Sequence, residues 1–170
     1  MTLQTHTIST WRNMLRALSG MLGKAAAHES AGTLMEGRLA DDMLPFATQI
    51  RMLANFPRQA LNSLANADFV SNEEDPTSLE DAKARIAETL AMLDTVADDA
   101  FIADEAMVDL DLPNGMKFRL SAADYVRDWA FPNFYFHVSI AYAIMRSNGV
   151  ELGKADLVPH MMQHLSQAPG

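Results

Sequence analysis

Two polar side chains, Asn133 and His137, lie four residues apart within the most apolar stretch of the chain. On a helix this spacing places both on one face, where they could bind one ion or one water molecule. A single histidine on an apolar helix is more often a core residue whose ring bonds to a backbone carbonyl or a polar side chain. Both interpretations require a buried helix around this pair.

Other candidate residues give weaker signals. Tyr135 could offer a hydroxyl group to a pocket, and Gln49 lies beside the apolar stripe of another expected helix, where we expect it to reach solvent. The remaining histidines lie in termini or at helix ends, with no ligand nearby in sequence: His6, His28, His160 and His164. The sequence has no Gly-rich phosphate loop, no His-Glu-x-x-His motif and no nucleophile elbow. Any chemistry is therefore expected to start at His137.

Composition excludes several classes of function. The chain has 170 residues, no cysteine and a net charge of -9. Its basic residues are scattered, which disfavours nucleic acid and anionic membranes as partners. Disulfides, thiolate ligands and a cysteine nucleophile are absent. The longest apolar run, residues 130–145, is too short to span a bilayer, and the first ten residues do not resemble a secretory signal. We expect a soluble, cytoplasmic protein.

Apolar residues at steps of three and four predict the helices that position these groups. The first covers residues 7–28. The second is capped by Asp41 or Asp42, carries Pro45 in its first turn and continues to about Ala65. The third begins with a capping box of Thr77 and Glu80 and continues to about residue 97. Pro57 should kink the second helix.

From residue 108 to 120 the apolar period changes to two, which predicts a β-hairpin. A three-residue loop at 113–115 pairs apolar residues with one another and acidic residues with basic ones. The expected pairs are Leu112 with Met116, Leu110 with Phe118, Val108 with Leu120, Asp111 with Lys117 and Asp109 with Arg119. A two-residue Asn-Gly turn would mix apolar and charged residues on each face. In the three-residue loop, Gly115 should adopt the left-handed backbone conformation.

The fourth helix should begin at the capping residue Ser121 and end at Asn148 and Gly149. Pro132 should kink or shift it just before Asn133. Because residues 129–145 lack a polar face, we expect this helix to be surrounded by the others. The predicted fold is an all-α four-helix bundle at residues 1–158, with the hairpin between helices three and four covering one end. Residues 159–170 should form a partly frayed tail.

The segments RLADDMLPFATQ (38–49) and NFYFHVSIAYAIMRSNGVELGK (133–154) resemble the DinB-like superfamily of four-helix bundles regarded as metalloenzymes. The chain is most similar to a bacterial branch catalogued as a domain of unknown function. Typical members bind a metal with one histidine from helix two and an i, i+4 pair on the last long helix, followed by Leu-Arg and a glycine. The trailing pattern is kept here as Met145, Arg146 and Gly149.

This resemblance places His137 at the second histidine of the pair, Asn133 at the first and Gln49 at the helix-two position. Amide oxygens are weaker ligands than imidazole for zinc or nickel. His137 together with Gln49 and Asn133 would therefore form a poor site for such a metal. They could equally form a buried hydrogen-bond network in which His137 bonds to Asn133 or Gln49.

The favoured function is a binding module whose ancestral metal site has degenerated, with a small-molecule ligand as one possibility. The alternative that the resemblance implies is a small metal- or thiol-dependent transferase or isomerase that uses His137. That enzyme requires an open pocket at His137 and a histidine that titrates near neutrality. Members of the superfamily often pair through faces of the bundle, so the resemblance also implies a homodimer.

Overall fold

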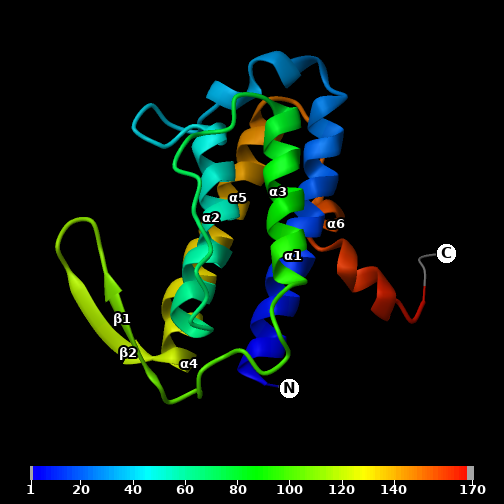
Figure 1. Cartoon of the computed structure of the whole chain (residues 1–170). Coiled ribbons are helices and arrows are strands. Elements are labelled where there is room, and N and C mark those ends of the chain that lie inside the picture. Colours follow the sequence, from blue (N-terminus) through cyan, green and yellow to red (C-terminus); the bar gives the residue numbers. More distant parts are fainter. Residues whose placement is uncertain (1, 168–170) are drawn as a thin grey trace.

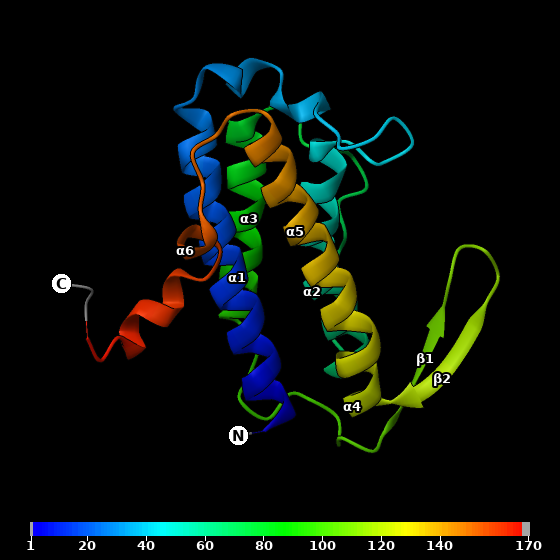
Figure 2. The same cartoon turned by 180° about the vertical axis from the view of Figure 1, so that it is seen from behind.

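The computed structural model describes residues 2–167 as a bundle of four long helices with a hairpin (Figure 1). The long helices are α1 (Leu3–Ala26), α2 (Phe46–Leu64), α3 (Leu79–Leu93) and α5 (Phe131–Ser147). Shorter elements are β1 (Met107–Asp111), β2 (Lys117–Ser121), α4 (Ala122–Asp124) and α6 (Lys154–Leu157). In the bundle, α3 lies against α1 and α2, and α2 also packs on α5, as Figure 2 shows from behind. The predicted all-α bundle with a hairpin before its last long helix is confirmed.

The core forms where the apolar stripes of the helices meet. Every residue of the stripes predicted for α1 and α2 is buried: Ile8, Trp11, Leu15, Leu18, Leu22 and Ala25 on α1, and Phe46, Ala47, Ile50, Leu53, Ala54, Leu61 and Leu64 on α2. Ala82 and Ile86 of α3 are also fully buried. Pro57 lies within α2, which continues through it. No helix within residues 2–167 is both long enough and apolar enough to cross a membrane.

Three helix starts differ from prediction by a few residues. Pro45 is the N-cap of α2, and Asp41 and Asp42 lie in a preceding loop that the Phe46 amide closes by donating to the Gly37 carbonyl at 2.8 Å. Ser78, and not Thr77, caps α3, because its hydroxyl accepts the backbone amide of Asp81 at 3.1 Å. α3 also ends earlier than predicted, at Leu93, and α1 spans Leu3–Ala26 in place of 7–28.

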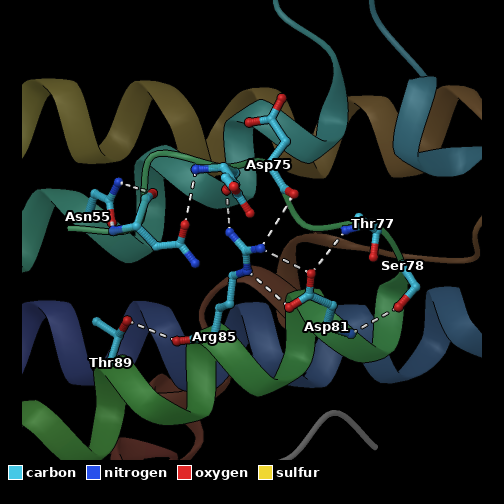
Figure 3. A network of polar contacts seen from close by, with 9 residues as sticks. Asn55, Asp75, Thr77, Ser78, Asp81, Arg85 and Thr89 are labelled. Atoms are coloured by element: carbon cyan, nitrogen blue, oxygen red, sulfur yellow. Dashed lines mark hydrogen bonds and ion pairs between the residues drawn. The ribbon is translucent and has the colours of Figure 1, made fainter.

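A polar network fixes the loop between α2 and α3, as Figure 3 shows. The Arg85 guanidinium donates to both carboxylate oxygens of Asp81, at 3.0 and 3.1 Å, and to the carbonyls of Glu74 and Asp75. Asn55 of α2 exchanges two hydrogen bonds with the backbone of Asn72, at 2.8 and 3.1 Å. Because the network joins side chains of both helices to backbone groups of Asn72, Glu74 and Asp75 in the loop, we interpret it as structural.

The hairpin has the predicted register. Val108 pairs with Leu120, Asp109 with Arg119, Leu110 with Phe118 and Asp111 with Lys117. The Leu112 amide donates to the Met116 carbonyl at 2.8 Å, and Gly115 has a φ of +86°. The expected position was wrong, since the hairpin leans outward beside α2 and does not cover an end of the bundle (Figures 1 and 2). Its first strand, β1, makes a small contact with α2.

The last long helix begins as predicted, because the Ser121 hydroxyl accepts the Asp124 amide at 3.1 Å. Its next turn is π-helical, over Tyr125–Ala130. Pro132 follows this turn, and a proline lacks the N–H of a regular helix and clashes with the carbonyl four residues earlier, which favours a widened turn. We call residues 125–130 the π turn. The helix ends at Ser147, and Gly149 has a φ of +88°.

The expectation that other helices surround this last helix was wrong. Tyr135 is 43% exposed and Phe136 is 55% exposed on the outer side of α5. Beyond α5, the carboxylate of Asp156 in α6 pairs with Lys24 of α1 at 2.7 Å. The predicted tail contains a short 3₁₀ helix at Pro159–His164, and residues 168–170 lie outside the described part of the chain.

Candidate functional site

His137 of α5 and Gln49 of α2 meet inside the bundle. The His137 Nδ1 atom lies 2.7 Å from Gln49 Oε1. His137 is 8% exposed and Gln49 is 1% exposed, so the expectation that Gln49 reaches solvent was wrong. Gln49 is buried because α2 packs against α5 along this side. Of the two bonds that the sequence allowed for His137, the structure has the one to Gln49.

A second bond fixes the proton on the histidine ring. Gln49 Nε2 donates to the Leu44 carbonyl at 3.1 Å, which turns Oε1 toward His137. Because an amide oxygen only accepts, His137 Nδ1 carries the hydrogen and Nε2 keeps its lone pair. Within residues 2–167, Nε2 has no hydrogen-bond partner, and it is not among the buried polar atoms that lack one. Nε2 is therefore not fully buried, although His137 as a whole is 8% exposed.

Two aromatic rings enclose the imidazole. The ring centroid of Phe56 lies 5.3 Å from that of His137, and Phe136 meets the ring edge-on at 5.2 Å. Burial among these groups lowers the pKa of His137 from 6.5 to about 4, because the charged form loses solvation. His137 is neutral at pH 7, which differs from the near-neutral titration that the enzyme hypothesis requires.

Asn133 does not join His137. Its Nδ2 atom donates to the carbonyl of Trp129 at 2.7 Å, within the same helix. This carbonyl lies at the junction where the π turn changes to α5, next to Pro132, where the regular ladder of backbone hydrogen bonds is interrupted. The three positions that the resemblance groups together are thus divided. His137 pairs with Gln49, and Asn133 is bonded to the backbone of Trp129.

Tyr135 lies apart from this pair. Its ring packs near Phe131 and Phe134, with centroids 6.0 and 6.5 Å away, and much of it faces solvent. Partial burial raises the pKa of its hydroxyl. Residues two positions apart on a helix lie on different faces, so Tyr135 points to a different side from His137.

The donor set does not fit a zinc or nickel ion. Such ions take three or four protein ligands, mostly imidazole, thiolate or carboxylate. Within residues 2–167 no group of three or more His, Asp or Glu side chains could hold a metal. Gln49 Oε1 is already bonded to His137, and the Asn133 side chain is bonded to Trp129. Among these three side chains, Nε2 of His137 is the one imidazole nitrogen left that could bind a metal ion.

A cleft of about 750 Å³ that includes Phe56 in its lining opens between α2, the hairpin and the π turn. We call it the hairpin cleft. It is lined by Met52, Asn55, Phe56, Gln59, Ser63, Glu73, Asp109, Leu110, Asp111, Leu112, Pro113, Asn114, Tyr125 and Trp129. The sequence analysis did not find it, because these residues come from four separate segments. The available sequence signal was the pair of aromatic residues Tyr125 and Trp129, which follow the hairpin in the chain.

Comparison with known proteins supports the fold. The family model for a domain of unknown function, DUF1993, matches residues 3–158. A crystal structure of a DinB family member protein from Shewanella denitrificans is similar, with a TM-score of 0.79 and 28% sequence identity. The similarity covers 92% of this chain and 91% of that one. No curated protein matches the chain.

Proposed function

Because the chain belongs to the DUF1993 family of domains of unknown function and its fold is DinB-like, we propose that it is a metal-free module that binds a small molecule. One observation carries the proposal: His137 Nδ1 donates to Gln49 Oε1 at 2.7 Å, at the position where the superfamily holds a metal. This bond satisfies both buried groups without an ion.

The hairpin cleft is the proposed binding site. Its volume of about 750 Å³ is within the range of ligand pockets, roughly 300–1,000 Å³. Half of its lining is apolar or aromatic, which is also typical of such pockets. Phe56 lines the cleft and also packs against His137, but His137 itself does not line the cleft.

The experiment that tests the proposal is metal analysis of untagged protein purified without chelator, before and after incubation with zinc, nickel and manganese. We expect no stoichiometric metal in the wild type or in His137→Ala. Stoichiometric metal in the wild type that is lost in His137→Ala would overturn the proposal. Asn133→Ala is the matched control, because it removes the neighbouring amide and leaves the imidazole in place.

A small transferase or isomerase that uses His137 is the second candidate. The lone pair of Nε2, which accepts no hydrogen bond from the described residues and is not fully buried, favours it, because that atom could accept a proton or a bond from a substrate. The pKa of about 4 weighs against it, since such a ring is a weak base at neutral pH. Turnover that is lost in His137→Ala while the hairpin cleft stays intact would decide for this candidate.

We further propose that two copies pair through the outer side of α5 and that the protein acts in the cytoplasm. Tyr135 and Phe136 are large apolar side chains exposed side by side, and a two-fold contact would bury both on each copy. The absence of cysteine is compatible with a reducing compartment.

A further inference from the structure

We propose that the hairpin cleft binds an organic cation, an ammonium group attached to an apolar or aromatic body. This inference rests on the proposed function and names the chemical class of its ligand. The argument uses the aromatic wall of the cleft, the charges around it and the way the π turn is held.

The cleft has an aromatic wall on the side of the helices. Trp129 and Tyr125 come from the π turn and Phe56 comes from α2. Leu110 and Leu112 of the hairpin line the opposite side. A cation above the face of a Trp, Tyr or Phe ring is attracted by the negative charge of that face, most strongly with Trp. The apolar side chains across the cleft would then cover the body of the ligand.

The charges at the cleft have one sign. Glu73, Asp109 and Asp111 line it, and its lining contains no Lys, Arg or His. Each of these carboxylates has a basic partner outside the lining, at 3.5 Å from Arg51, 3.7 Å from Arg119 and 2.9 Å from Lys117 respectively. The three carboxylates are largely exposed to water, where an ion pair contributes little, so they can still attract a second cation. The net charge of -9 adds to this attraction.

A second cavity offers a contrast. The cavity of about 510 Å³ between α2 and α3 is lined by Arg51, Arg58 and Arg85 together with three glutamates. The guanidiniums of Arg51 and Arg85 already contact Asp75, Asp81 and loop carbonyls. That cavity is lined by charged groups of both signs, whereas the charged groups that line the hairpin cleft are all acidic.

Asn133 is a positioning residue for this cleft. Its bond to the Trp129 carbonyl holds the backbone of the π turn where Trp129 reaches the cleft. π turns of this kind are frequent at functional sites. Asn133, at the position of a metal ligand in the superfamily, therefore supports the aromatic wall of the hairpin cleft in this protein.

The test is isothermal titration calorimetry with benzyltrimethylammonium, compared with benzyl alcohol and benzoate as neutral and anionic probes that carry the same ring. We expect a Kd on the order of 0.1–1 mM for the cation. Benzyl alcohol should bind about tenfold more weakly, because it lacks the cation–π attraction. Benzoate should show no measurable heat of binding.

Two aromatic-to-leucine variants on the same helix locate the site. Trp129→Leu should weaken binding of the cation about tenfold. Phe136→Leu, which changes an exposed ring outside the cleft, should leave the Kd unchanged. Equal effects of the two variants, or no effect of Trp129→Leu, would overturn the assignment of the cleft, and circular dichroism on both would verify that they are folded.

The outcomes separate this inference from the proposed function. Equal or tighter binding of benzyl alcohol in the same cleft would overturn the cation class and leave a small-molecule module. No binding of any probe by the wild type would overturn the inference. Stoichiometric metal on His137 would instead overturn the proposed function.

Discussion

His137 Nδ1 and Gln49 Oε1 lie 2.7 Å apart across the contact between α5 and α2, both buried. Gln49 is in turn bonded to the Leu44 carbonyl at 3.1 Å, so a chain of two hydrogen bonds joins α5 to the loop before α2. A buried donor and acceptor that satisfy each other stabilise the packing of these two helices, and removing one of them leaves the other without a partner.

Removing one member of the pair should lower stability. His137→Leu leaves the Gln49 oxygen with no donor from the ring, and Gln49→Leu leaves the His137 N–H with no acceptor. We expect each variant to lose about 1–3 kcal/mol of unfolding free energy in urea titrations. Replacing both should cost less than the sum of the two, by roughly 0.5–3 kcal/mol, and strict additivity would contradict the bond. Ligand binding in the hairpin cleft should be unchanged in His137→Leu.

Stability should fall as the pH is lowered from about 6.5 to about 4. The folded pKa of His137 is lowered to about 4 from an unfolded value of 6.5, so between these values the unfolded chain binds a proton that the folded chain does not. The stabilising contribution is complete above pH 6.5 and is lost as the pH falls toward 4. It amounts to roughly 3 kcal/mol at most.

Urea titrations between pH 4 and pH 7.5 would measure this pH dependence. The slope over that range should be reduced in His137→Leu and retained in His6→Gln, since His6 is exposed. A wild-type slope equal to that of His137→Leu would show that His137 titrates normally.

Asn133→Ala should destabilise the π turn. It removes the hydrogen bond from Nδ2 to the Trp129 carbonyl, worth about 0.5–1.5 kcal/mol. The near-ultraviolet circular dichroism signal of Trp129 should change as well, because its backbone loses this support. Asn148→Ala removes a similar bond at the other end of α5, from Nδ2 to the Ile144 carbonyl, and should leave the tryptophan signal unchanged.

Phe136→Glu should convert the proposed dimer to monomer. A charge on the outer side of α5 could not be buried in a two-fold contact without a partner. Sedimentation velocity at micromolar concentration would measure the change, with Met162→Glu as a control at an exposed apolar residue in the tail. A wild-type chain that is already monomeric would contradict the dimer.

Two glycine substitutions should have opposite effects. Gly20 lies in the middle of α1 with open space around it, so Gly20→Ala should stabilise the protein by about 0.5–1 kcal/mol. Gly149 has a φ of +88°, and a Cβ there would lie 3.2 Å from His28 Cε1. Gly149→Ala should therefore destabilise it, by roughly 1 kcal/mol or more. Thermal unfolding of both variants would measure the difference.

Features set by local spacing were predictable from the sequence. The apolar stripes of α1 and α2, the pairing of the hairpin and the cap at Ser121 each follow from the alternation or capping chemistry of adjacent residues. The resemblance in two short segments correctly indicated the DinB-like bundle. Boundary errors of a few residues arose where neighbours such as Thr77 and Ser78 could both serve as a cap.

Only the tertiary structure decided how the site is arranged. The sequence placed Gln49, Asn133 and His137 together by analogy, but the rotation of α2 brings Gln49 alone to His137, and the π turn before Pro132 draws Asn133 to Trp129. An apolar helix can be buried on every face, yet Tyr135 and Phe136 are exposed, because hydrophobicity permits burial without requiring neighbours to supply it. The hairpin cleft depends on four segments that meet only after folding, so the aromatic residues Tyr125 and Trp129 could not by themselves outline it.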